Sequence, residues 1–274
     1  MSGAILKSAA EIEIMDEANE IIRGILGDLS GMVAPGVSTG ELDEYAERRI
    51  RDGGGEPAFK GYPHPSGGLA FPGTICASVN DEIVHGVPSP ERRLKAGDIV
   101  SVDLGILYRG YYGDSAQTFA VGPVSDEAGR LLQVTRESLG AAIVEARPGN
   151  RVSDIGHAVQ NHVEPSGFSV VREFVGHGIG SRLHEDPQIP NFGPAGRGAR
   201  LAPGMVLAIE PMVNCGSPEV LLTAADGWTA RTRDGSLSAH FEVSVAITEQ
   251  GPLVLGGPFE NNVRETAKRA DLGV

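Results

Sequence analysis

The chain has 274 residues, of which 41% are hydrophobic and 22% charged, a composition typical of an ordinary globular protein and not of a disordered or fibrous one. Its 36 acidic residues outnumber its 23 basic residues and give a formal net charge of −13, so nucleic acids and membrane surfaces are unfavourable partners. No apolar run has the length of a membrane span or a signal peptide, and Cys76 and Cys215 lie far apart without CxxC spacing. We therefore expect a cytoplasmic protein without disulfides or a thiolate zinc site.

Two helices are predicted at the start of the chain. Capping-box spacing begins at Ser8 and again at Ser38, each with a glutamate three residues later. Apolar residues recur with a helical period from the first box to Leu29, and the sequence APG at 34–36 ends that helix. The second helix ends at the glycine-rich sequence 52–57.

Strands are predicted next, at 74–79 and in a hairpin over 99–119 that turns at 108–110. Two further helices begin at Ser125 and Val152, and short strands continue to residue 247.

The order of these elements repeats. We interpret the repeat as an internal duplication within one domain, with halves at about 1–122 and 123–250. The alternative is that Pro-Gly, which follows a helix in both halves, is simply a common helix stop. If the duplication is real, the strands of both halves should join in one mostly antiparallel sheet backed by helices, which is an α+β fold.

The hairpin carries two carboxylates. Asp103 and Gly105 share one face of the first strand, and a turn centred on residues 109–110 places Asp114 opposite Gly105 on the same face. The two aspartates are then diagonal neighbours, about 7–8 Å apart at Cα. A cation between them would relieve both their repulsion and their lost hydration. The alternative is that one aspartate caps a turn and the other pairs with a surface lysine.

Three other segments add donors of the same kind. His177 lies between glycines in GHGIG, Glu210 ends an apolar strand before Pro211, and Glu242 lies in the apolar run 238–247. Four carboxylates and one imidazole suit a pair of divalent ions such as Mn, Fe(II), Co or Zn, and do not suit a thiolate zinc or a copper site.

In chain order, the motifs VDLG, GDSAQTF, GHGIG, IEP and FE, which hold these five residues, resemble the type I methionine aminopeptidases in their bacterial form without an N-terminal extension. The resemblance runs from the first helix to about residue 250. It implies the pita-bread fold, with two pseudo-symmetric αα/ββ halves. It also implies a metalloaminopeptidase that removes the initiator methionine from nascent proteins and peptides and prefers a small second residue. Its partners would be the N-termini of nascent polypeptides, with the ribosome as a candidate meeting place, and a monomer would suffice.

The resemblance implies a role for each donor. Asp103 would bind one metal ion, and His177 together with Glu210 would bind the other. Asp114 and Glu242 would bridge both ions. A hydroxide between the ions would be the nucleophile, and Glu210 would shuttle its proton to the leaving amine.

Further residues fit the same resemblance. His85 would contact the scissile amide, and His184 would steady the tetrahedral oxyanion. Aromatic and sulfur groups, which contact a thioether favourably, would receive the methionine side chain. These pocket residues are Phe59, Tyr62, Phe71, Cys76, Leu183 and Trp228. For Phe59 and Leu183, core packing is an equal alternative. His64, His157, His162 and His240 are expected to lie outside the metal ligands, although His240 should share a strand face with Glu242.

The sequence departs from the family in two places. Val243 follows Glu242 where the family commonly has a histidine, but it should point to the other strand face, so we expect the metal site to survive. The connection 63–70, which borders the predicted pocket, is longer than usual and also reads as a surface loop.

Three other functions occur on the same fold. Prolidases and proline-specific aminopeptidases use the same ligands but carry an additional N-terminal domain, for which the residues before Asp103 leave no room. A non-catalytic binding module of this fold would typically have lost ligands. A metal-free enzyme like creatinase is disfavoured by the same intact residues.

Overall fold

The computed structural model describes residues 3–222 and 225–257. Its helices are α1 (Ala9–Met32), α2 (Thr39–Asp52), α3 (Asp126–Glu145), α4 (Val152–Val163) and the short 3₁₀ helix η1 (Glu164–Ser166). Its strands are β1 (Glu56–Pro57), β2 (Ile75–Val79), β3 (Glu82–Val84), β4 (Ile99–Tyr108), β5 (Tyr111–Ala120), β6 (Ser169–Val170), β7 (Gly176–Gly178), β8 (Glu185–Ile189), β9 (Val206–Ile209), β10 (Met212–Asn214), β11 (Val220–Leu221), β12 (Ala230–Thr232), β13 (Ser238–His240), β14 (Glu242–Thr248) and β15 (Gly251–Val254).

The first two helices begin where the sequence predicts. The Ser8 hydroxyl accepts a hydrogen bond from the backbone N–H of Glu11, and the Glu11 carboxylate accepts one from the Ser8 N–H. Ser38 and Glu41 make the same reciprocal pair. Each box satisfies two backbone donors that a helix start leaves without a partner.

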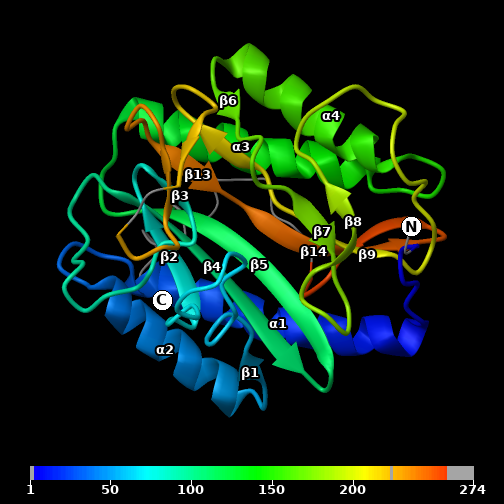
Figure 1. The fold of residues 1–274 in the computed structure, drawn as a ribbon, viewed down its shortest axis with the longest axis horizontal. Helices are drawn as coiled ribbons and strands as arrows, with labels where there is room; N and C mark the ends of the chain where they lie inside the picture. Colours follow the sequence, from blue (N-terminus) through cyan, green and yellow to red (C-terminus); the bar gives the residue numbers. More distant parts are fainter. Residues whose placement is uncertain (1–2, 223–224, 258–274) are drawn as a thin grey trace, which may run out of the picture.

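One antiparallel sheet of nine strands runs through the molecule, in the order β1-β4-β5-β14-β9-β7-β8, with β2 paired to β4 and β15 to β14. In Figure 1, α1 and α2 lie on one side of these strands, and α3 and α4 lie on the opposite side of the picture. The seam is the pair β5–β14, in which Glu242 lies opposite Ala116. Strands from early and late in the chain therefore share one sheet, as predicted, whereas the internal duplication itself stays a prediction.

The hairpin register decides which side chains leave the core. Asp114 pairs with Gly105 and Asp103 with Ala116, which is the predicted register. The turn residues Arg109 and Gly110 have φ angles of 48° and 88°, as a two-residue type I′ hairpin requires. Alternate β4 residues, at 100, 102, 104 and 106, pack in one hydrophobic cluster with α1 and α2. The face that carries both aspartates therefore points away from these helices.

A buried ion pair fastens the N-terminal segment to β8. Lys7 Nζ lies 2.6 Å from Glu185 Oε2, and the two residues are 7% and 6% exposed. Lys7 Nζ also donates to the Ile5 carbonyl at 2.9 Å, and the Lys7 N–H donates to the Gly204 carbonyl at 2.7 Å. The pair thus fixes the residue directly after His184.

Removing one partner of this pair should be costly. Lys7→Met leaves Glu185 buried without its cation, and we expect the free energy of unfolding to fall by about 3–5 kcal/mol in urea titrations. Glu17→Gln is the control, because Glu17 pairs with Arg109 across 2.8 Å with side chains that are 41% and 55% exposed. That change should cost less than about 1 kcal/mol. Equal decreases in the free energy of unfolding of the two variants would show that the buried Lys7–Glu185 pair stabilises the fold no more than an exposed pair.

Candidate metal centre and adjoining pocket

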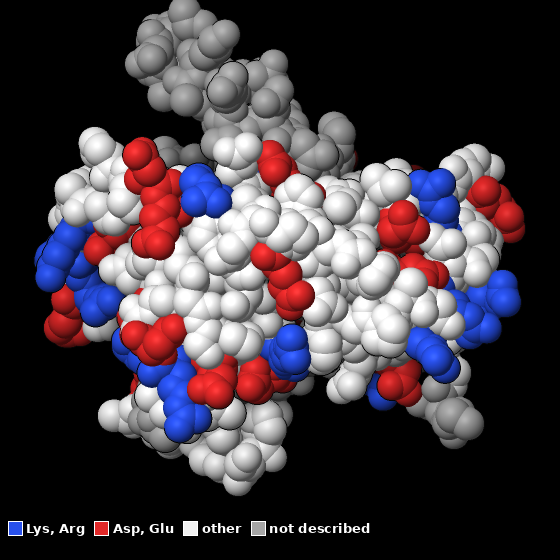
Figure 2. Space-filling model, turned by 90° about the horizontal axis from the view of Figure 1, so that it is seen from above, with Lys and Arg blue, Asp and Glu red and all other residues white. Residues whose placement is uncertain are grey.

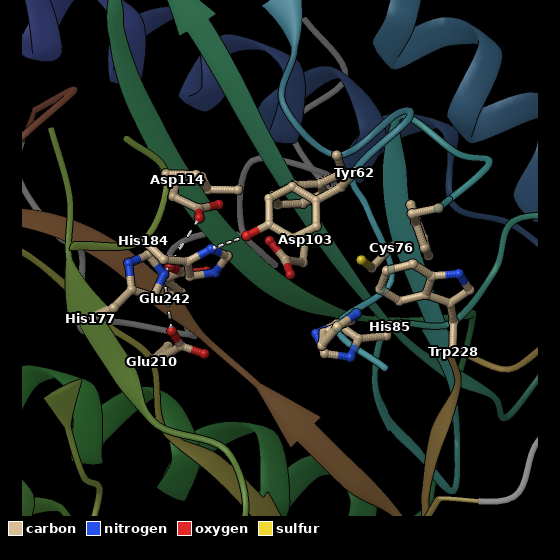
Figure 3. A pocket seen from close by; sticks show the side chains of 14 residues that line it. Tyr62, Cys76, His85, Asp103, Asp114, His177, His184, Glu210, Trp228 and Glu242 are labelled. Carbon is tan, nitrogen blue, oxygen red and sulfur yellow. Dashed lines mark hydrogen bonds and ion pairs between the residues drawn. The ribbon is translucent and has the colours of Figure 1, made fainter. Parts of the chain in front are cut away.

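All thirteen residues assigned to the site from the sequence, Leu183 among them, line one cavity of about 330 Å³. Figure 3 shows the acidic residues and His177 toward one end and Trp228 with Cys76 toward the other, with His85 also on that side. The cavity therefore joins a polar end to an apolar end.

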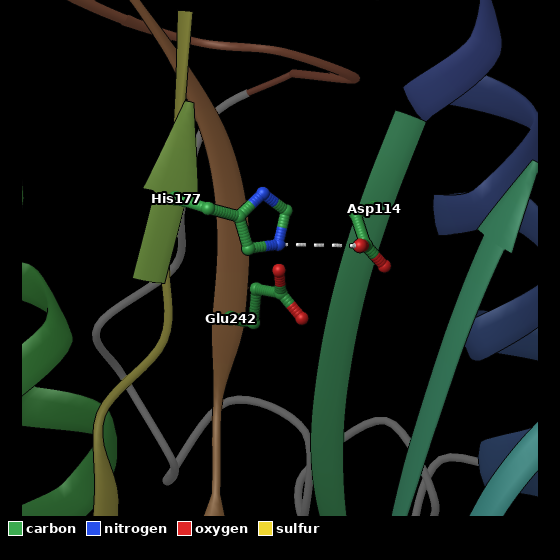
Figure 4. Close-up of side chains that lie close together, drawn as sticks. All are labelled: Asp114, His177 and Glu242. Atoms are coloured by element: carbon green, nitrogen blue, oxygen red, sulfur yellow. Dashed lines mark ion pairs between the residues drawn. The ribbon is translucent and has the colours of Figure 1, made fainter. Parts of the chain in front are cut away.

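The five donors come from neighbouring strands of the sheet. Asp103 lies on β4, Asp114 on β5, Glu242 at the start of β14, Glu210 directly after β9 and His177 on β7. Asp114, His177 and Glu242 are buried and each offers a donor atom within 4.8 Å of the other two (Figure 4). His177 Nε2 lies 3.6 Å from Glu210 Oε1 and 3.9 Å from Asp114 Oδ2.

The carboxylates are in an unfavourable electrostatic position. Burial raises the pKa of Asp103 to about 7. Burial, and then the charges of neighbouring carboxylates, raise the pKa values of Asp114, Glu210 and Glu242 well above the ordinary range. Of the described residues that line the cavity, none is a lysine or an arginine. The charge of these groups is thus uncompensated by the side chains around them.

The donor set fits divalent metal ions. Asp103 Oδ1, Asp114 Oδ1 and Glu242 Oε1 are buried and have no hydrogen-bond partner, although such atoms normally have one. A cation would satisfy these atoms and cancel the repulsion between the carboxylates. Burial, the largest cause, raises the pKa of the Cys76 thiol well above its usual value, so this nearby sulfur stays protonated and does not join the oxygen-rich set.

His177 presents the correct nitrogen to the acidic residues. Its Nδ1 lies 2.9 Å from the Gly178 carbonyl, which can only accept, so Nδ1 carries the proton and Nε2 is free to bind a metal. Burial lowers the pKa of His177 to about 4, which keeps the ring neutral near pH 7.

The other two predicted histidines are neutral groups in the same cavity. His184 Nδ1 is hydrogen-bonded to the Tyr62 hydroxyl at 2.8 Å, and its ring lies 4.4 Å from that of His177. Burial lowers the pKa of His184, and it lowers that of His85 to about 4. His85 has a φ of 59°, an uncommon conformation for a residue other than glycine, and such residues cluster at functional sites.

His240 is closer to the site than the sequence indicated. The expected continuous strand over 238–247 is divided, because β13 ends at His240 and β14 begins at Glu242. His240 is 2% exposed, and its Nε2 lies 3.8 Å from Glu210 Oε2. Asn191, which the sequence did not single out, donates through Nδ2 to the Glu210 carbonyl at 2.9 Å. His157 and His162 lie in α4, as expected.

Metal binding should stabilise the protein more as the pH rises. The pKa of Asp103 rises on folding from 3.8 to about 7, so its contribution to the stability of the metal-free chain is lost as the pH rises through that range. The pKa of His177 falls from 6.5 to about 4, so its neutral, metal-binding form prevails above that value. Metal and protons therefore compete for the same groups. We expect the increase in Tm caused by Mn(II) to grow between about pH 5.5 and pH 7.5. Calorimetry with and without EDTA measures it, and an increase that shrinks over this range would contradict the donor assignment.

Comparison with known proteins supports the same class. The model of metallopeptidase family M24 matches residues 13–249 of this chain. The prolidase from Pyrococcus furiosus shares the fold alone, with a TM-score of 0.75 and 24% identity, and the match covers 94% of this chain and 66% of the prolidase. The fold and the site thus define a metallopeptidase, a hydrolase that uses divalent metal.

Relatives with higher sequence identity identify the group within family M24. Methionine aminopeptidase 1 of Bacillus subtilis is 54% identical over 247 residues, which cover 90% of this chain and 96% of the relative. Methionine aminopeptidase of Clostridium acetobutylicum is 49% identical over 251 residues, covering 92% and 98%. The crystal structure of methionine aminopeptidase from Thermotoga maritima matches with a TM-score of 0.89 and 43% identity, over 93% of this chain and 100% of that one. The chain belongs to the methionine aminopeptidases of family M24, and the fold and function expected from the sequence are confirmed.

The surface carries both signs of charge. On the face shown in Figure 2, Lys and Arg side chains lie close to Asp and Glu side chains. Of the helices in the described part of the chain, none has the length and apolar character to cross a membrane.

Proposed function

We propose that this chain, acting in the cytoplasm, releases the N-terminal methionine from nascent proteins and peptides that have a small second residue. The observation that carries the proposal is the single cavity that joins the five metal donors to the apolar end. A monomer suffices, because every residue of the site comes from one chain, and the ribosome is a candidate place of contact with the substrate.

The donors would divide between two ions. Asp103 would hold one ion, His177 and Glu210 would hold the other, and Asp114 and Glu242 would serve both. Mn, Fe(II), Co and Zn all suit this donor set. When bound, the ions supply Lewis acidity and lower the pKa of water, which makes it a nucleophile near neutral pH.

Glu210 moves the proton. Its carboxylate lies among the metal donors, 3.6 Å from His177 Nε2, where it would accept a proton from water and deliver it to the leaving amine. Asn191 holds the Glu210 backbone, and His177 and His240 lie beside its two carboxylate oxygens. The proton acceptor is therefore held in one place.

His85 and His184 position the substrate. Both rings are neutral near pH 7, so each can donate a hydrogen bond without carrying a charge. His184 lies beside His177, where the oxygen of the scissile carbonyl gains charge during attack. His85 lies on the Trp228 side of the cavity, edge-on to the indole at 6.3 Å, where it would contact the scissile amide.

The apolar end receives the methionine side chain. Phe59, Tyr62, Phe71, Cys76 and Trp228 line it, and a protonated thiol and aromatic rings contact a thioether favourably. The Phe71 and Trp228 rings, which meet edge to face at 5.2 Å, form part of its wall.

Cleavage of four peptides tests the proposal. The metal-loaded protein should release methionine from Met-Ala-Ser and leave Leu-Ala-Ser and Ala-Pro-Ser intact. Met-Leu-Ser should be cut more slowly than Met-Ala-Ser, which tests the preference for a small second residue. Cleavage of the proline peptide alone would move the chain to proline-specific hydrolysis, and cleavage of none would favour a binding module.

A further inference from the structure

We propose that the segment 63–70 is a working part of the methionine pocket, in which His64 and the backbone of Leu69 hold the indole of Trp228 against the bound side chain. The inference rests on the proposed function, because it concerns the specificity of that same pocket. It gives a role to the connection that is longer than usual in this family. His64 is thereby a positioning residue that acts through Trp228.

The segment reaches the cavity directly. Pro65 lines the cavity together with Tyr62 and Trp228. Most of the segment is exposed, and Leu69 is 87% exposed, whereas His64 is half-buried. A loop that served only as a surface connection would not need Pro65 at the cavity or a half-buried His64.

The indole is held from two directions. Trp228 Nε1 donates to the Leu69 carbonyl at 3.1 Å, and the His64 ring meets the Trp228 ring edge to face with centroids 4.8 Å apart. Phe71, which directly follows the segment, meets the indole edge to face with centroids 5.2 Å apart. Such aromatic pairs restrict a ring to one orientation.

His64 is itself fixed in one tautomer. Its Nε2 lies 3.0 Å from the Gly227 carbonyl, which can only accept, so Nε2 carries the proton. Its Nδ1 accepts a hydrogen bond from the Ser66 N–H at 3.2 Å, which an unprotonated nitrogen alone can do. The neutral ring therefore ties the segment to the turn that carries Trp228.

The turn needs this outside support. Residues 225–227 are exposed, and Asp226 accepts hydrogen bonds from the N–H groups of Trp228 and Thr229 and from the Thr229 hydroxyl, none of which involves the indole. The indole itself contacts segment 63–70 and Phe71, and more distantly the His85 ring at 6.3 Å. If the segment is weakened, the indole should become mobile, and the pocket should discriminate less sharply between methionine and a branched side chain.

Tryptophan fluorescence tests the contact without relying on activity. Trp228 is the only tryptophan of the chain, so the intrinsic emission reports on it alone. In His64→Ala, emission should shift to longer wavelength and acrylamide quenching should increase. The matched control is His157→Ala. His157 lies on helix α4, and its Nδ1 is likewise 3.0 Å from a glycine carbonyl, that of Gly193. A response in His64→Ala no larger than in His157→Ala would overturn the proposal.

Steady-state kinetics test the consequence. With metal restored, His64→Ala should raise KM for Met-Ala-Ser by about two- to tenfold and leave kcat nearly unchanged, as expected from the loss of one aromatic contact. The preference for Met-Ala-Ser over Leu-Ala-Ser should fall. His64→Phe keeps an aromatic edge and should restore part of the KM. A changed emission with unchanged KM and preference would overturn the role in specificity. Failure of the wild type to release methionine would instead overturn the proposed function, whereas the fluorescence comparison would still decide whether His64 holds Trp228.

Discussion

Asp114→Asn is expected to abolish both metal uptake and the release of methionine. Asp114 lies within 4.8 Å of donor atoms on His177 and Glu242, and it is 4% exposed. The asparagine keeps the shape but lacks the charge that a shared metal ligand must supply. Activity should fall by more than the roughly hundred- to thousandfold that the loss of one oxyanion donor costs. Glu242→Gln should behave in the same way.

The same change should not unfold the metal-free protein. Burial and neighbouring carboxylates raise the pKa of Asp114, so its negative charge opposes folding when no cation is bound. The metal-free variant should therefore be at least as stable as the metal-free wild type near pH 7. Glu219→Gln, at an exposed pair with Arg233, is the control for charge removal. Metal content by atomic absorption and methionine release should be measured together. Full activity in Asp114→Asn or in Glu242→Gln would show that the replaced residue does not bridge the ions.

His184→Ala is expected to reduce kcat by about a hundred- to a thousandfold while metal content stays normal. His184 Nδ1 is hydrogen-bonded to the Tyr62 hydroxyl, which orients the imidazole ring in the cavity next to His177. The variant loses a donor to the developing oxyanion but loses no metal ligand. Tyr62→Phe keeps the imidazole and removes its orienting partner, so its loss should be smaller.

A split between KM and kcat distinguishes the role of His184 from simple binding. A donor that acts mainly in the transition state affects kcat, whereas one that binds substrate and transition state equally affects KM. A rise in KM alone would make His184 a substrate-binding residue. Loss of metal from the purified variant would make it a ligand, contrary to the assignment.

Local chemistry accounts for the parts of the fold that the sequence predicts well. The caps at Ser8 and Ser38 depend on residues three positions apart, and the register of Asp103 and Asp114 depends only on strand alternation and a two-residue turn. These features need no knowledge of distant strands.

The remaining features depend on pairing between strands that are distant in the sequence. The order β5-β14-β9-β7 brings Glu242, Glu210 and His177 beside Asp114, and no local pattern encodes that order, so their convergence was expected from the resemblance. His240 approaches Glu210 because the strand breaks before Glu242. The sequence 63–70 reads as a loop because of its prolines and glycines, and its partner Trp228 lies far along the chain.

The most direct test of metal-dependent methionine release uses Met-Ala-Ser and protein that has been stripped with chelator and then reloaded with Mn(II). We expect no release from the stripped protein and full recovery as the ions return, with free methionine as the only amino-acid product. Release that continues undiminished after stripping, or none after refilling with Mn(II), Co(II) or Fe(II), would contradict this expectation.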